Sequence, residues 1–276
     1  MNVHERTTRR VTGLRAAASM LPILAALAVA GCNSVGDFGK GSVTAQAINP
    51  SDPPAKIEAA AEYWTKRFAD DPKDKTAAIN VSVAMRALNK KLSAVLVMRQ
   101  AQEFHPNDPE ILGELGKALA DAGQLQEAAG ILDQAQKSGT ADWRMLSAYG
   151  TVLDQLQRHK EAQASYMEAL KLVPNEPSVM NNLGLSYALD KKLAEAETIL
   201  RKAAAHPAAP QQAKENLALV LGLQGKFGEA EAVAKSTLPP DAVASNTSYL
   251  KQMMAQPANW AKLQAMEAKE TTGSTN

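Results

Sequence analysis

"EFHPNDPEI" (residues 103–111) and "KLVPNEPSV" (residues 171–179) carry a proline, an asparagine, an acidic residue and a second proline in the same order. Their first prolines, Pro106 and Pro174, stand twice 34 residues apart, and Pro72 precedes Pro106 by 34 residues. Proline cannot continue a helix, because it lacks the backbone N–H and clashes with the preceding turn. The recurrence therefore predicts a unit of 34 residues with a helix-ending turn at each boundary.

Five units aligned at this period carry the same residue types at the same positions. They begin at Lys75, Pro109, Trp143, Pro177 and Gln211. The eighth position is always small: Ser82, Gly116, Gly150, Gly184 and Ala218. The twentieth is always alanine: Ala94, Ala128, Ala162, Ala196 and Ala230. The fourth, seventh and eleventh positions lie on one stripe of a helix, so each unit is predicted to be a closely packed pair of helices.

The clearest unit is "NLGLSYALDKKLAEAETILRKAAAHP" (residues 182–207). Its L-G-x-x-Y pattern, with a later alanine and proline, resembles the tetratricopeptide repeat. This resemblance implies an all-α fold, a right-handed superhelical solenoid of helix-turn-helix repeats. Such a solenoid presents a concave groove lined by the first helix of each unit.

The two ends of the repeat region depart from the pattern. We expect repeats over residues 55–240, with a partial first unit before Lys75 in which Ala55 to Phe68 forms a lone second helix. Residues 241–276 are predicted to form a capping helix, with Asp241 as its N-cap, followed by a polar tail. Terminal repeats of solenoids must present a polar outer face, which explains the departures.

The start of the chain is predicted to be a signal rather than part of the fold. Several arginines precede the apolar run "AAASMLPILAALAVA" (residues 16–30), and Gly31-Cys32 follows it. This order resembles a bacterial lipobox, which implies that residues 1–31 are removed and that Cys32 carries lipid. The alternative is that Cys32 is a buried or incidental thiol. Asn33, in place of aspartate, implies by the same resemblance the periplasmic face of the outer membrane, and residues 32–54 are expected to form a flexible tether.

Composition and motifs argue against several other classes of function. The formal net charge is +1, without the concentrated basic face that a nucleic-acid binder needs. His4, His105, His159 and His206 are not at metal-ligand spacing with one another, with Cys32 or with a carboxylate, and His159 is predicted to lie in a loop between helices. The sequence contains no phosphate-binding loop and no nucleophile motif. We therefore expect no catalysis, no metal and no cofactor.

The predicted groove carries asparagines at recurrent positions. Asn80, Asn182 and Asn216 share the sixth position of their units, and Asn181 precedes Asn182. An asparagine side chain has both a donor and an acceptor, so it can bind the backbone amides of a peptide. These four residues are the predicted partner-binding site, and a solvated polar face is the alternative interpretation.

A more specific resemblance covers most of the mature chain. The lipobox at Cys32, "YWTKRFADDPKD" (residues 63–74) and "ENLALVLGLQGKFGEAEAVAKSTLPPDAV" (residues 215–243) are similar to the tetratricopeptide lipoprotein of tight-adherence (Flp-type) pilus systems. This resemblance implies a pilotin-like protein that helps a secretin reach or assemble in the outer membrane. Its partners would be the pilus secretin or other pilus components.

Two other functions remain open from the sequence. One is a general periplasmic chaperone or a scaffold lipoprotein of cell-envelope assembly. The other is an enzyme whose site is built on the solenoid, since a fold alone does not determine a function.

Overall fold

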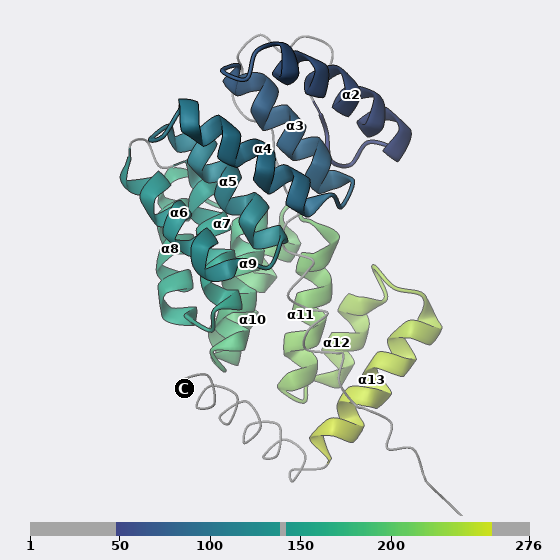
Figure 1. Cartoon of the computed structure of the whole chain (residues 1–276). Coiled ribbons are helices and arrows are strands. Elements are labelled where there is room, and N and C mark those ends of the chain that lie inside the picture. The colour runs from purple at the N-terminus through teal and green to yellow at the C-terminus, as the bar shows by residue number, and fades with distance from the viewer. Residues whose placement is uncertain (1–47, 139–141, 256–276) are drawn as a thin grey trace, which may run out of the picture. The chain divides into compact units, whose positions relative to one another are not determined.

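The computed structural model describes residues 48–138 and 142–255, apart from the side chain of Met254. Over these residues the chain forms twelve helices and no strand (Figure 1). The first helices of the five units are α3 (Lys75–Ala87), α5 (Pro109–Asp121), α7 (Trp143–Gln155), α9 (Pro177–Leu189) and α11 (Gln211–Leu223). The second helices are α4 (Lys91–Phe104), α6 (Leu125–Lys137), α8 (His159–Leu172), α10 (Leu193–Ala205) and α12 (Phe227–Ala234). The prediction of an all-α repeat fold is confirmed.

The recurrent proline-rich stretches contain both the end of one helix and the start of the next. Pro106 and Asn107 lie in the turn after α4, and Asp108 is the N-cap of α5. The Asp108 side chain accepts hydrogen bonds from the backbone N–H groups of Glu110 and Ile111. Pro109 occupies the first turn, where the missing N–H has no helical partner to lose.

The turn within each unit, between its first and second helices, has a left-handed residue at the same position. These residues are Asn89, Gly123, Gln157, Lys191 and Gly225, with φ between 58° and 78°. Glycine adopts this conformation without a steric penalty, whereas for other residues it costs about 1–2 kcal/mol. The repeated backbone geometry, rather than the residue type, is therefore the constant feature of this turn.

The small eighth position allows the two helices of a unit to pack closely. A methyl group added at Gly150 would lie 2.7 Å from Cε1 of Tyr166, and one added at Gly184 would lie 2.5 Å from Cγ of Leu200. Gly116 faces Leu132 in the same way. In these three units the glycine thus accommodates a large side chain of the second helix. The five alanines at the twentieth position are all buried.

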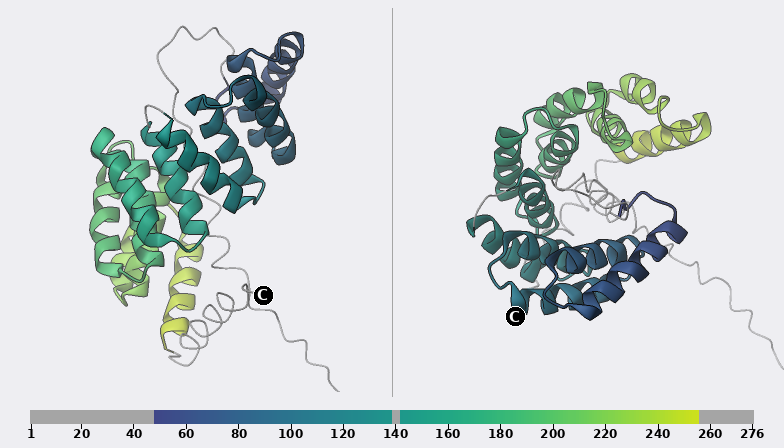
Figure 2. Two further views of the ribbon diagram at one scale, coloured as in Figure 1. Left: turned by 60° about the vertical axis from the view of Figure 1, so that its left-hand side comes forward. Right: turned by 90° about the horizontal axis from the view of Figure 1, so that it is seen from above.

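Successive helices pack against one another along the chain, and each first helix also contacts the first helix of the next unit from α3 to α11 (Figure 2). At the start, α2 (Pro54–Asp70) packs on α3 and buries Trp64 and Phe68. At the end, α13 (Pro240–Met254) packs on α11 and α12, and Leu250 lies over Gly222.

The predicted capping residue of this last helix is wrong. Asp241 lies inside the first turn of α13, and the N-cap position is taken by Pro239 without a side-chain hydrogen bond. The N-cap lies two residues earlier than predicted because Pro240, with its fixed φ, suits the first helical position.

Candidate partner-binding face

Three of the four asparagines predicted to bind a partner lie in one chain of hydrogen bonds. On α9, Asn182 Nδ2 donates to Oγ of Ser147 on α7 over 3.3 Å, and Asn181 Nδ2 donates to Asn182 Oδ1 over 3.4 Å. On α11, Asn216 Nδ2 donates to Asn181 Oδ1 over 2.9 Å. We call Ser147, Asn181, Asn182 and Asn216 the asparagine ladder. It crosses the first helices of three successive units, and we refer to the side formed by these helices as the first-helix face.

The ladder does not use all the hydrogen-bonding capacity of its members. A side-chain amide has two N–H donors and a carbonyl oxygen with two lone pairs. The ladder engages one N–H of each asparagine. Asn181 is 7% exposed, whereas Asn182 and Asn216 are half-buried. The face that a partner could reach is therefore formed by Asn182 and Asn216, with Asn181 holding them in place.

Asn80 does not join the ladder. Its Nδ2 donates to the backbone oxygen of Thr76 on the same helix, α3, over 2.8 Å. The sequence places Asn80 at the same repeat position as Asn182, but position alone does not determine its hydrogen-bond partner. The structure thus brings together three of the four predicted residues.

A charged cluster links α3 and α5. Arg86 donates to Glu114 Oε1 over 2.9 Å and to Asp121 Oδ2 over 2.6 Å. Ser82 also donates to Glu114 Oε1, and Lys117 forms an ion pair with Glu114 Oε2 over 3.5 Å. Glu114 is only 2% exposed. These contacts join the first two units through buried charge.

The environment shifts the protonation equilibria of this cluster. Burial acts to raise the pKa of Glu114, but the charges of Arg86 and Lys117 and the hydrogen bonds from Arg86 and Ser82 outweigh it, so the pKa lies below its ordinary value. Burial lowers the pKa of Lys117, although the Glu114 carboxylate opposes that shift. Glu114 is accordingly held as a carboxylate inside the fold.

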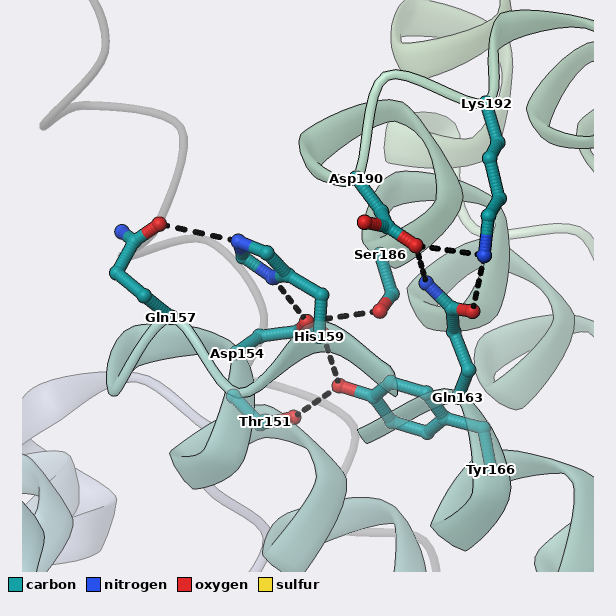
Figure 3. Close-up of polar contacts among 9 residues, drawn as sticks. All are labelled: Thr151, Asp154, Gln157, His159, Gln163, Tyr166, Ser186, Asp190 and Lys192. Atoms are coloured by element: carbon teal, nitrogen blue, oxygen red, sulfur yellow. Dashed lines mark hydrogen bonds and ion pairs between the residues drawn. The ribbon is translucent and has the colours of Figure 1, made fainter. Parts of the chain in front are cut away.

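A second polar network joins α7, α8 and α9, with Asp154 at its centre (Figure 3). Asp154 Oδ1 accepts from Ser186 Oγ over 2.7 Å and lies 2.9 Å from Nδ1 of His159. Asp154 Oδ2 accepts from the Tyr166 hydroxyl over 3.2 Å. The same hydroxyl lies 3.2 Å from the hydroxyl of Thr151. One buried carboxylate therefore connects the third and fourth units.

A neighbouring set of contacts extends this connection to the turn before α10. Gln163 on α8 donates to Asp190 Oδ2 over 3.1 Å and accepts from Lys192 over 3.3 Å (Figure 3). Lys192 also forms an ion pair with Asp190 over 2.6 Å. The second helix of one unit is thereby attached to the turn of the next.

Serine, aspartate and histidine meet in the Asp154 network, but their order differs from that of a catalytic triad. In a triad the histidine contacts the nucleophilic hydroxyl and the carboxylate orients the histidine. Here Ser186 and His159 both contact Asp154, and the other ring nitrogen of His159 lies 3.0 Å from Oε1 of Gln157. The serine is also fully buried. This geometry holds helices together and does not activate a nucleophile.

Sequence reasoning missed the Asp154 network and misplaced one member. His159 is the first residue of α8 rather than a loop residue, and from there its ring reaches Asp154. The sequence did contain a signal that could have indicated the network. Within one unit, an acidic residue on the first helix is accompanied by a tyrosine on the second. The other units have apolar residues where Tyr166 stands: Met98, Leu132, Leu200 and Ala234.

Two further properties concern the described part of the chain. Residues 48–138 and 142–255 contain no group of three or more histidine, cysteine, aspartate or glutamate side chains placed to hold a metal ion. None of the described helices is long and apolar enough to span a membrane. Cys32 and the predicted signal lie outside the described residues.

The repeats match two profiles of the tetratricopeptide repeat. One matches residues 87–142, 114–177 and 147–213, and the other matches residues 211–235. A protein of Sinorhizobium fredii, y4yS, is 32% identical over 95 residues, which are 34% of this chain. The matched region spans 52% of that relative, or about half of its length.

Solved structures share the fold at low sequence identity. YrrB, described as a tetratricopeptide protein with an unusual peptide-binding site, superposes with a TM-score of 0.53 at 19% identity, covering 68% of this chain and 99% of its own. PilW, described as a widely conserved type IV pilus biogenesis factor, has a TM-score of 0.60 at 19% identity, covering 67% and 88%. The Cut9–Hcn1 complex has a TM-score of 0.62 at 20% identity, covering 71% and 39%.

Proposed function

Because this chain belongs to the tetratricopeptide repeat family, we propose that it is a non-catalytic scaffold that binds an extended segment of a protein partner on its first-helix face. The observation that carries this proposal is the asparagine ladder across α7, α9 and α11. It aligns amide groups of successive units in one row. An extended peptide presents its own amides in a row, so donor and acceptor groups can pair along it.

The ladder also favours binding because it is already ordered. Asn181 donates to Asn182 and accepts from Asn216, which restricts the rotamers of both neighbours before a partner arrives. Side chains that are fixed in advance lose less conformational entropy on binding. Asn182 and Asn216 then supply a partner with donors at positions set by the fold.

We further propose that the scaffold acts at the outer membrane as a pilotin-like lipoprotein that assists the secretin of a tight-adherence pilus. The lipobox at Cys32 and the family resemblance of residues 63–74 and 215–243 support this proposal. PilW, which shares the fold, is described as a pilus biogenesis factor, and this is consistent with the proposal. The partner segment would belong to the secretin.

The lipid anchor and the secretin role can be tested together. We expect the Cys32→Ser variant to remain as an unprocessed precursor without lipid label, and the secretin to leave the outer-membrane fraction when the protein is deleted. A variant that is still lipidated would overturn the anchor. Normal secretin localisation after deletion, with cell-envelope assembly disturbed more widely, would instead support a general envelope scaffold.

A further inference from the structure

The start of α4 carries two exposed leucines. Leu92 is 67% exposed and Leu96 is 69% exposed, the highest values among the large apolar side chains that the structure describes. They are four residues apart on one helix and therefore lie on the same face. Exposed apolar side chains that stand together indicate a contact surface more often than isolated ones do.

The repeat itself does not require leucine at these two positions. The equivalent pairs in the later units are Gln126 and Gly130, Lys160 and Ala164, Ala194 and Thr198, and Gly228 and Ala232. Those residues are polar or small. The leucine pair is thus a property of the first full unit alone, and packing between repeats does not explain it.

Positive charge accompanies the leucines. Lys90 and Lys91 directly precede Leu92, and both lysines are exposed. The acidic residue of α4 itself, Glu103, stands near the opposite end of the helix. We call Lys90, Lys91, Leu92 and Leu96 the α4 patch. It combines apolar side chains with cationic groups, as surfaces that rest on anionic lipid do.

The first described residue and a residue just before this patch contact the same buried cluster. Ile48, the first described residue, packs on the same small cluster of Ile57, Ala61 and Ala84 as Leu88 does. Leu88 is the C-cap of α3 and stands two residues before Lys90 in the sequence. Only residues 33–47 separate Ile48 from Cys32 along the sequence.

We propose that the α4 patch rests on the anionic phospholipid surface to which Cys32 tethers the chain. This rests on the lipid anchor of the proposed function. Leu92 and Leu96 would enter the boundary between headgroups and acyl chains, while Lys90 and Lys91 would pair with lipid phosphates. Because α4 is a second helix, the patch and the asparagine ladder lie on different helices, so membrane and partner can be bound together.

Vesicle binding tests the patch without the anchor. The protein is residues 32–276 with Cys32→Ser, which retains every described helix, and the vesicles contain phosphatidylethanolamine and phosphatidylglycerol. We expect Leu92→Gln/Leu96→Gln to weaken binding about tenfold or more, since each leucine would lose buried apolar area. Lys90→Gln/Lys91→Gln should weaken binding to these anionic vesicles about fivefold per lysine. The same variant should bind vesicles of phosphatidylcholine, which has no net charge, almost like the parent.

Matched variants serve as controls. Met167→Gln/Leu172→Gln replaces side chains on α8 that are 45% and 53% exposed, and Lys160→Gln/Lys202→Gln replaces two other exposed lysines. All should bind vesicles like the parent. Equal binding by the leucine variant and its control would overturn the proposal while leaving the lipid-label test of Cys32 unaffected. Loss of secretin binding by the leucine variant, with vesicle binding unchanged, would overturn it in favour of a protein contact.

Discussion

Glycine at the eighth position of a unit determines how closely its two helices approach. A methyl group at Gly184 would lie 2.5 Å from Leu200 Cγ and 2.7 Å from Ile199 Cγ2, closer than packed atoms allow. We therefore expect Gly184→Ala to destabilise the fold by about 1–3 kcal/mol, as overpacking does. Urea unfolding followed by circular dichroism measures this change.

Gly130 provides the matched control for this prediction. It lies inside α6, and a methyl group there would meet nothing within 4 Å. Gly130→Ala should then stabilise the protein by about 0.5–1 kcal/mol, since alanine is the better helix former. Equal effects of the two substitutions would show that the helix pairs do not pack as described.

Asn181 supports its neighbours more than it contacts solvent. Asn181→Ala would remove one donor and one acceptor from a position that is 7% exposed, leaving Asn182 Oδ1 and an Asn216 N–H without these partners. We expect a loss of about 1–3 kcal/mol in the free energy of unfolding. Asn80→Ala, which breaks a bond to the backbone of its own helix, should cost no more than about 0.5 kcal/mol. Similar melting curves for both variants would argue against the ladder.

The lowered pKa of Glu114 links stability to pH. The folded state favours the carboxylate form of Glu114, because the pKa is lower there than in the unfolded chain. The carboxylate therefore adds to the free energy of unfolding above the unfolded-state pKa of about 4.3. This added stability is lost as the pH falls through the lower folded-state pKa. Glu114→Gln should therefore be much less stable than the parent at pH near 7 and differ little from it in strong acid. Urea melts across pH check this. A difference that does not depend on pH would contradict the assignment.

At the scale of single elements, α13 closes the end of the array. It packs on α11 and α12, and Val243 completes a buried cluster with Ala218 and Ala234. A chain that stops after Leu238 should expose these side chains, melt at a lower temperature and aggregate more readily, because terminal repeats need a polar outer surface. A chain that stops after Ala255 keeps every described helix and should melt like the parent. Equal melting of the two truncated chains would mean that α13 is not a cap.

The sequence predicted the helices far better than the polar contacts between them. Proline, small residues and alanine recur at a fixed period because each satisfies a local requirement of the helix pair, so the starts of the first helices could be read directly. The N-cap of α13 was misplaced by two residues, since two consecutive prolines compete for the first turn. His159 was misplaced because its role depends on Asp154 across a turn.

The candidate site was predictable in composition but not in connectivity. The repeat position of Asn182 and Asn216 could be counted, and the structure places both in the ladder. That Asn181 bridges them, while Asn80 bonds to its own helix, depends on side-chain rotamers and on how units stack. These contacts join residues about one unit apart, but only a single pair of units makes them. The sequence therefore contains no repeated pattern from which they could be predicted.

At the scale of the whole molecule, the central claim is that the protein acts as a scaffold by binding its partner on the first-helix face of the repeats. Calorimetric titration of the purified periplasmic region of the secretin that we propose as the partner into the Asn182→Ala/Asn216→Ala variant tests this most directly. The control is Gln100→Ala/Gln126→Ala, which replaces two exposed glutamines on second helices. We predict binding weaker by about twofold to twelvefold per asparagine, corresponding to about 0.5–1.5 kcal/mol per net hydrogen bond, and unchanged binding by the control. Undiminished binding by an asparagine double variant whose circular dichroism confirms its fold would show that the partner does not bind this face.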